Sequence, residues 1–254
     1  MNTRIRNDKT MKPTIPVKTR RAESCFWDCY ARCYDGLQAT IPYRRLVERA
    51  VACVPPHAGT LLDAGCGTGN LLHAIHRRHP ALALHGLDFS AAMLRRAKTK
   101  LTNAVLTAGN LNEALPYPTG FFDVVTCINA LYAVARPEST VAELRRVLKP
   151  GGALIVSSPC AQPRMMSFIR AQAAETGWWR TMPLLVRLSA LLPFNVLIFR
   201  RGHSAQYHFL DFRAAGRLLA CETVSPAYAG LNWFASTRNG TPVCAANVAL
   251  PQLA

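Results

Sequence analysis

The 254-residue sequence has few acidic side chains. Fourteen Asp and Glu stand against 30 Lys and Arg, which gives a formal net charge of +16. The sequence also lacks C-x-x-C spacings and any cluster of carboxylates. His73, His76 and His79 have H-x-x-H spacing, but we expect them at the surface of a helix, and we therefore expect no metal site. No apolar run follows the basic residues at the start of the chain, which argues against a secretory signal.

Low-complexity linkers and internal repeats are absent as well, while half of the residues are hydrophobic. This composition excludes global disorder and provides enough apolar side chains for a large core. The first 21 residues contain seven Lys and Arg and one Asp. We therefore expect residues 1–22 to be a flexible basic tail and residues 23–254 to form one domain.

The nine cysteines are odd in number, and we expect reduced thiols in a cytoplasmic protein. Cys25, Cys29 and Cys33 recur at every fourth position of an expected helix over 23–34. About 12 Å of helical rise separates Cys25 from Cys33, whereas ligands of one zinc ion lie about 4 Å apart. One helix cannot supply all three ligands. We favour a buried helical face and leave a redox or thiophilic-metal role as the alternative.

Residues 61–70, LLDAGCGTGN, are the most informative segment. Two apolar residues end an expected strand, Asp63 stands at its tip, and Gly65, Gly67 and Gly69 alternate before a helical pattern. Glycines at this spacing let the backbone approach a ligand and then turn into a helix whose N-terminus faces it. The spacing differs from the G-x-G-x-x-G fingerprint of dinucleotide-binding proteins.

A second acidic residue follows at the distance that a nucleotide-binding β-α-β unit requires. The stretch 81–87 ends in Asp88, about twenty residues beyond the glycines, where a carboxylate accepts hydrogen bonds from both ribose hydroxyls. Ser90 can cap the next helix. Phe89 and Met93 offer apolar faces for an adenine ring.

Three further segments continue the alternation of strands and helices. Residues 104–108 predict a third strand that leads into Gly109-Asn110-Leu111. The segment FFDVVTC at 121–127 predicts a fourth strand, and LKPGG at 148–152 precedes a fifth. Strands that alternate with helices in this way predict a parallel sheet with helices on both faces.

DAGCGTGN at 63–70, DFSAAML at 88–94 and LKPGG at 148–152 together resemble the class I S-adenosylmethionine-dependent methyltransferases. This resemblance covers roughly residues 60–158. It implies an α/β, Rossmann-like fold with a seven-stranded, mostly parallel sheet whose last strand is antiparallel. It implies S-adenosyl-L-methionine as cofactor and S-adenosyl-L-homocysteine as product, without a metal. Asn110 stands where the family usually has Asp. The cofactor-binding residues that the resemblance implies are Asp63, Ala64, Gly65, Cys66, Gly67, Asp88, Phe89, Met93, Asn110, Leu111 and Asn129.

Methyl transfer is an in-line displacement that requires alignment and, for a hydroxyl or an acidic carbon, removal of a proton. Residues 27–35 resemble a Y-A-x-x-Y-D signature of small-molecule and lipid methyltransferases, in which the residue matching Tyr34 lines the pocket. Tyr132 stands where relatives often carry His or Tyr facing the acceptor. His203 and His208 are further candidates for a base. We therefore predict Tyr34, Tyr132, His203 and His208 as catalytic residues.

Residues 160–209 form an expected insertion after the fifth strand. Its apolar stretch, 182–199, approaches membrane-spanning length but contains Pro183, Arg187, Pro193 and Asn195, which oppose a transmembrane helix. In the resembling enzymes an insertion here is a helical lid over the acceptor site. A surface that touches a membrane or accepts an apolar substrate is the alternative, because aromatic and basic residues flank the stretch.

We expect a methyltransferase acting on a small, amphipathic or lipid-like metabolite. An RNA methyltransferase is a second hypothesis because of the positive charge, but nothing resembles an appended RNA-binding module. A non-catalytic, cofactor-binding partner subunit is a third. The sequence leaves the acceptor atom, the oligomeric state and peripheral contact with a membrane open.

Overall fold

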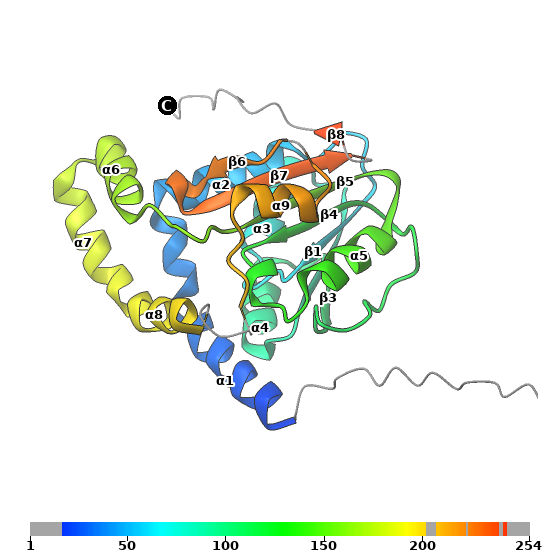
Figure 1. The fold of residues 1–254 in the computed structure, drawn as a ribbon, viewed down its shortest axis with the longest axis horizontal. Coiled ribbons are helices and arrows are strands. Elements are labelled where there is room, and N and C mark those ends of the chain that lie inside the picture. The colour runs from blue at the N-terminus through cyan, green and yellow to red at the C-terminus, as the bar shows by residue number, and fades with distance from the viewer. Residues whose placement is uncertain (1–16, 202–206, 222, 239–240, 243–254) are drawn as a thin grey trace, which may run out of the picture.

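A computed structural model describes residues 17–201, 207–221, 223–238 and 241–242. At its centre lies one twisted sheet with the strand order β3-β2-β1-β4-β5-β7-β6 (Figure 1). The two-residue strand β8 pairs with β7 beside this path. The strands are β1 Thr60–Ala64, β2 Ala83–Asp88, β3 Val105–Ala108, β4 Phe122–Ile128, β5 Leu148–Pro159, β6 Ser225–Ala227, β7 Asn232–Arg238 and β8 Thr241–Pro242.

Strands β1 to β5 run parallel, and β7 runs antiparallel to both β5 and β6. The predicted mostly parallel sheet with a late antiparallel strand is therefore confirmed. The strand order reverses direction between β1 and β4, which are neighbours although two strands separate them in sequence. In open α/β sheets the ligand-binding crevice lies outside the carboxyl ends of the strands at such a reversal.

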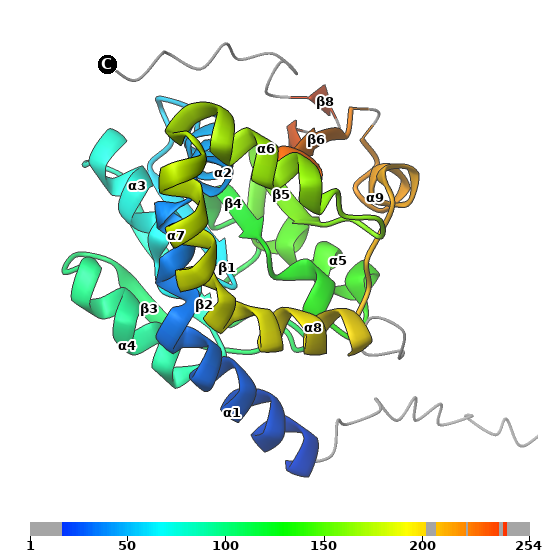
Figure 2. The same ribbon diagram turned by 90° about the vertical axis from the view of Figure 1, so that its left-hand side faces the viewer.

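Helices cover both faces of the sheet, as predicted (Figures 1 and 2). One apolar core includes side chains from α5, and the other includes side chains from α2 and α3. The helices are α1 Val17–Tyr34, α2 Ile41–Ala52, α3 Asn70–Arg78, α4 Ala91–Lys100, α5 Pro137–Val147, α6 Met165–Thr176, α7 Trp178–Leu188, α8 Leu192–Arg201 and α9 Phe212–Leu218. The shorter 3-10 helices are η1 Asp35–Ala39, η2 Leu131–Ala133, η3 Ser189–Leu191 and η4 Tyr228–Gly230.

The start of α1 differs from the expected boundary of the basic tail. The helix begins at Val17, so residues 17–22, which we assigned to a flexible tail, are helical. Residues 1–16 lie outside the described part of the chain. The helical pattern that we recognised from residue 23 onward thus extends one and a half turns upstream, through a segment whose basic side chains are compatible with a helix.

The insertion after β5 is helical and consists of α6, α7, η3 and α8. These helices stand beside the sheet, and α7 and α8 run in different directions on either side of η3 (Figure 2). The 23-residue segment Trp178–Arg200 contains an 18-residue window with a mean hydropathy of 1.8, of which 11% is buried. By length and composition alone it is sufficient to cross a membrane. Because of the turn between α7 and α8, however, it is not one straight rod.

Candidate active site

The loop after β1 requires glycine for its backbone conformation. Gly65, Gly67 and Gly69 have φ angles of 80°, 53° and 76°, a region that residues with a Cβ rarely adopt. A Cβ at Gly65 would collide with the side chain of Ala130. At Gly67 the nearest atoms would be Met93 Sδ and Tyr34 Cε1, both 3.9 Å away. The loop therefore keeps an open space beside Gly67, which a side chain there would partly fill.

Two buried carboxylates lie at the ends of the neighbouring strands β1 and β2. Asp88 accepts hydrogen bonds from the backbone N–H groups of Gly67 and Ser90, both at 2.9 Å. Asp63 accepts one from the hydroxyl of Thr126 at 2.7 Å. Burial raises the pKa of Asp88 to about 6 and that of Asp63 to about 7. Asp88 is thus held against the glycine loop, where a ribose would place its hydroxyls.

Other predicted cofactor residues gather around the same loop. Leu111 Cδ1 lies 3.5 Å from the Cβ position of Gly65, and Met93 faces Gly67. Phe89 is 39% exposed and contacts the edge of Trp27, with 6.5 Å between ring centroids. The side-chain oxygen of Asn110 instead accepts two hydrogen bonds from Asn112, so it is already engaged within its own turn. The open space, the buried acid and the apolar side chains fit an adenosine-type cofactor.

Two acidic residues that the sequence analysis did not single out fix helix α1, Asp28 to the start of α4 and Asp35 to the glycine loop. Asp28 accepts hydrogen bonds from the hydroxyl of Ser90 at 2.5 Å and from the backbone N–H of Ala92 at 3.2 Å. Asp35, directly after α1, accepts one from Thr68 at 2.5 Å and one from Lys100 at 2.7 Å. Burial opposes ionisation of Asp35, but these bonds outweigh it and hold its pKa below the usual value. The last two turns of α1 are therefore held in place at Asp28 and Asp35, beside the start of α4 and the glycine loop.

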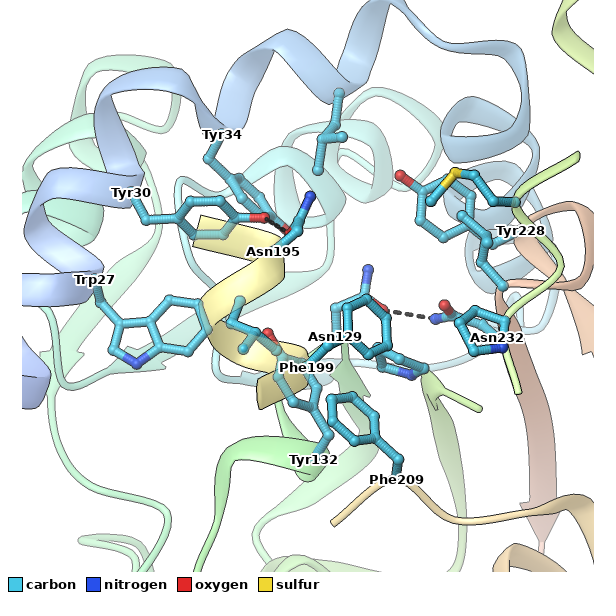
Figure 3. A pocket seen from close by; sticks show the side chains of 16 residues that line it. Trp27, Tyr30, Tyr34, Asn129, Tyr132, Asn195, Phe199, Phe209, Tyr228 and Asn232 are labelled. Carbon is cyan, nitrogen blue, oxygen red and sulfur yellow. Dashed lines mark hydrogen bonds between the residues drawn. The ribbon is translucent and has the colours of Figure 1, made fainter. Parts of the chain in front are cut away.

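An apolar cavity of about 130 Å³ lies next to the loop, between α1, α8 and the carboxyl ends of the strands. Figure 3 shows Trp27, Tyr30 and Tyr34 on α1 along one side and Asn129 near the centre. Most of its wall is aromatic or aliphatic. It is lined by Trp27, Tyr30, Tyr34, Leu37, Asn129, Tyr132, Pro159, Pro163, Met165, Asn195, Ile198, Phe199, Phe209, Tyr228, Leu231 and Asn232.

The polar groups of the cavity are few and are fixed by hydrogen bonds. Asn129 directly follows β4 with a φ of 56°, and its side-chain oxygen accepts a hydrogen bond from Asn232 at 2.6 Å. Asn232 also donates to the hydroxyl of Ser157 at 3.0 Å. Across the cavity, the Tyr30 hydroxyl donates to the side-chain oxygen of Asn195 at 3.1 Å. These contacts join α1 to α8 and β4 to β7 around one space.

The cavity wall contains no His, Asp, Glu, Lys or Arg among the residues that the structure describes. Burial raises the pKa of each tyrosine in the wall far above neutral. These hydroxyls therefore stay protonated at neutral pH. The described wall can position an apolar molecule and donate hydrogen bonds to it, but it offers no side chain that is ready to accept a proton.

Of the predicted catalytic residues, Tyr34 and Tyr132 line the cavity. His208 does not line it, and its Nε2 atom contacts the backbone oxygen of Ala135 at 3.1 Å instead. Its neighbour Phe209 faces the cavity instead and stacks on Tyr132, with 5.6 Å between centroids. His203 lies outside the described residues.

Several wall residues were missed by the sequence analysis. Trp27 and Tyr30 precede Tyr34 at the i, i+3, i+7 spacing of one helical face, a signal that was available in the sequence. Asn195 and Asn232 come from distant parts of the chain, and no local pattern marks them.

The expected buried cysteine face on α1 is wrong. Cys25 and Cys29 are exposed, and only Cys33 is partly buried. The aromatic side chains of Trp27 and Tyr30 occupy the inner face instead, because they bury more apolar area than a thiol. The described residues contain no group of three or more His, Cys, Asp or Glu that could hold a metal ion.

Comparisons with known proteins agree with this geometry. A sequence model described as "Methyltransferase domain" matches residues 62–156. A demethylmenaquinone methyltransferase of Thermus thermophilus is 37% identical over 190 residues, which cover 68% of this chain and 85% of that protein. Human methyltransferase-like protein 27 is 38% identical, and the ubiquinone/menaquinone biosynthesis C-methyltransferase UbiE of Geobacter sulfurreducens is 32% identical. Those alignments cover 52% and 56% of this chain, and the chain spans little more than half of these two proteins, 56% and 59%.

Solved structures show the same fold. A methyltransferase of Thermotoga maritima, described as a possible histamine N-methyltransferase, aligns with a TM-score of 0.51 at 18% identity, over 78% of this chain and 77% of that one. The plantazolicin methyltransferase BpumL, solved in complex with a triazolic desmethylPZN analog and SAH, aligns with a TM-score of 0.52 at 18% identity, over 80% of this chain and 74% of that one.

Proposed function

Because this chain belongs to the class I S-adenosylmethionine-dependent methyltransferases, we propose that it methylates a small, amphipathic metabolite with an apolar, ring-containing body. The observation that carries this proposal is the aromatic cavity beside the glycine loop. Small-molecule sites are concave, mostly apolar and supplied with a few fixed polar groups. The cavity has these properties, and Tyr34 borders both it and the space at Gly67.

Bound S-adenosylmethionine supplies an already activated methyl group. The protein's contribution is then mainly alignment, for which Asn129 and its partner Asn232 provide fixed hydrogen-bonding atoms at the end of β4. The helical insertion acts as a lid in this proposal, since Asn195 and Phe199 of α8 form part of the cavity wall.

The absence of an ionisable base among the described wall residues narrows the class of acceptor. An acceptor that ionises by itself near neutral pH, or that carries a free lone pair, needs no such base: a phenol, an acidic carbon, a thiol or an amine. The new bond forms as the sulfur–methyl bond breaks, the bonding electrons return to sulfur, and the proton of the acceptor passes to solvent. The rate should then follow the pKa of the acceptor.

Demethylmenaquinone, the acceptor in the name of the Thermus relative, is the first compound to test, because this chain covers 85% of that relative. We also propose that the protein works in the cytoplasm, since none of the cysteines in the described residues forms a disulfide.

The test incubates the protein with methyl-tritiated S-adenosylmethionine and an extract of the source cells, and then separates organic, RNA, protein and aqueous fractions. We expect label in the organic fraction, lost in the Asp88→Asn variant. Label in RNA would favour an RNA methyltransferase instead. No label despite tight binding of S-adenosylhomocysteine would favour the cofactor-binding partner subunit.

A further inference from the structure

The helical insertion exposes an unusual amount of apolar side chain. We call the exposed apolar residues of α7 and α8 the insertion patch: Trp178, Trp179, Met182, Val186, Leu192, Val196, Leu197 and Phe199. Trp179 is 93% exposed and Val186 is 72% exposed. Large exposed apolar patches on a soluble protein mark sites of contact with another molecule or a membrane.

The spacing of these residues gives each helix one apolar stripe. On α7, Trp178, Met182 and Val186 recur at every fourth position, and on α8 Leu192, Val196 and Phe199 follow a similar period. Residues at this spacing lie on one side of a helix. The outer sides of α7 and α8 are thus apolar, although no part of the described protein covers them.

The charges within the same segment have one sign. Arg180, Arg187 and Arg200 are exposed, and residues 176–201 contain no Asp or Glu. Tryptophans beside arginines are typical of helices that lie in the interface of a bilayer, where the rings reach the acyl boundary and the guanidinium groups meet anionic headgroups.

A second copy of the chain fits the patch less well. A two-fold contact brings the same surface of both copies together, so the arginines of one copy would face those of the other. Residues 176–201 offer no carboxylate to neutralise them. A spanning helix is disfavoured as well, because α7 and α8 run in different directions and Arg187 lies in the last turn of α7.

We propose that α7 and α8 bind the surface of an anionic lipid bilayer through the insertion patch, and that the acceptor enters the cavity from the bilayer past Phe199. Phe199 connects the two surfaces, because it is 36% exposed and also lines the cavity. Asn195 and Ile198, on the same helix, line the cavity too, and the bond from Tyr30 to Asn195 holds α8 over it. Binding to the bilayer stands on the patch alone, whereas the entry route rests on the proposed function.

The test is flotation of the full-length protein with vesicles of phosphatidylcholine alone or mixed with phosphatidylglycerol. The wild type should float with the anionic vesicles. The double variant Trp178→Ser/Trp179→Ser should bind them about tenfold or more weakly, because it removes the two rings that would enter the interface. Arg180→Gln/Arg187→Gln should lose about thirtyfold on anionic vesicles and change little on neutral ones.

Val105→Ser is the matched control, since Val105 is 55% exposed on β3, at the opposite edge of the sheet from β6. It should bind vesicles as the wild type does. All variants must bind S-adenosylhomocysteine in solution with unchanged affinity, which shows that they fold. Acyl chains labelled with bromine should quench the tryptophan fluorescence of the wild type much more than that of the Trp178→Ser/Trp179→Ser variant.

Three results would overturn the inference. The first is no flotation of the wild type with either vesicle. The second is equal flotation of all variants, which would assign binding to the basic N-terminal residues that every variant retains. The third is a solution dimer that Trp178→Ser/Trp179→Ser converts to a monomer, without any vesicle binding. If the protein methylates an acceptor dissolved in detergent but does not bind vesicles, the proposed function stands and the bilayer inference fails. If it binds vesicles but does not methylate any acceptor, only the proposed function fails.

Discussion

The hydroxyl of Thr68 donates a hydrogen bond to the carboxylate of Asp35 at 2.5 Å, which joins the glycine loop to the residue directly after helix α1. Lys100 of α4 donates to the same oxygen at 2.7 Å. Because α1 also forms one wall of the cavity, this carboxylate joins the glycine loop to that wall.

Asp35→Asn should therefore loosen α1 above the loop. The variant loses the ion pair between Lys100 and Asp35, whose side chains are 22% and 28% exposed, respectively. We expect a loss of about 1 kcal/mol in the free energy of unfolding. S-adenosylhomocysteine should dissociate about fivefold faster, because the helix over it opens more often. Urea unfolding and stopped-flow fluorescence measure the two effects.

The control for Asp35→Asn is Glu175→Gln. This change removes the ion pair with Arg45, whose side chains are 46% and 45% exposed. It should cost less than about 0.5 kcal/mol and leave the dissociation rate unchanged. Equal dissociation rates in both variants would show that α1 does not restrain the cofactor.

Asp88→Asn should weaken cofactor binding more than it weakens the fold. A carboxylate that accepts hydrogen bonds from ribose hydroxyls contributes about 1.5–3 kcal/mol for each bond, so we expect at least about tenfold weaker binding by titration calorimetry. Asp123→Asn is matched to it, because Asp123 accepts bonds from the backbone N–H groups of Gly59 and Thr60 at the opposite end of β1. That variant should lose stability and keep its cofactor affinity.

The stability of the cofactor-free protein should fall as the pH rises from about 4 to about 7. In the folded state burial raises the pKa of Asp63 to about 7 and that of Asp88 to about 6, from the usual 3.8. Within this window the folded protein retains protons that the unfolded chain releases, so raising the pH favours unfolding. Asp35 and Asp123, whose pKa values are lowered, contribute with the opposite sign and only at lower pH.

Asp63→Asn should reduce this slope and stabilise the cofactor-free protein by about 2 kcal/mol at pH 8, because the amide removes a buried charge and still accepts the bond from Thr126. Urea unfolding at several pH values measures it. A steeper slope in this variant would mean that the Asp63 carboxylate is stabilised by the fold.

Tyr132→Phe should leave kcat/KM within about threefold of the wild type and its pH profile unchanged. Burial raises the pKa of this hydroxyl far above neutral, so it does not take a proton from the acceptor. Tyr132→Ala should lower kcat/KM by about tenfold or more, since it removes a wall of the cavity and the ring that stacks on Phe209. A large loss in Tyr132→Phe, with the basic side of the profile displaced, would restore a catalytic role for the hydroxyl.

The sequence was sufficient for the cofactor half of the molecule because its signals are local. The glycines, Asp63 and the helix that follows β1 stand within a single stretch, and their conformations are set by neighbours in the chain. Asp88 follows at the distance that one helix and one strand impose. Such short-range patterns identify both the fold and the loop.

The cavity could not be predicted from the sequence in the same way, because the contacts in its wall join segments that are far apart in the chain. The bond between Tyr30 and Asn195 spans 165 residues, and that between Asn129 and Asn232 spans 103. Neither partner carries a pattern that points to the other. The wrong prediction at Cys25 and Cys29 has a different cause. Trp27 and Tyr30 also recur at a helical spacing, and their larger apolar side chains occupy the inner face of α1 in place of the thiols.

The insertion leaves the sheet after Pro159, the last residue of β5, and the described chain resumes after it at Tyr207, which packs on Tyr132. The side chains nearest to the glycine loop all come from outside this stretch. The insertion supplies Asn195, Ile198 and Phe199 to the cavity wall, so this part of the wall can vary in sequence while the glycine loop stays the same. A chimera that carries the corresponding helices of another methyltransferase between these two points should therefore change the part of the cavity that α8 forms and leave the glycine loop as it is.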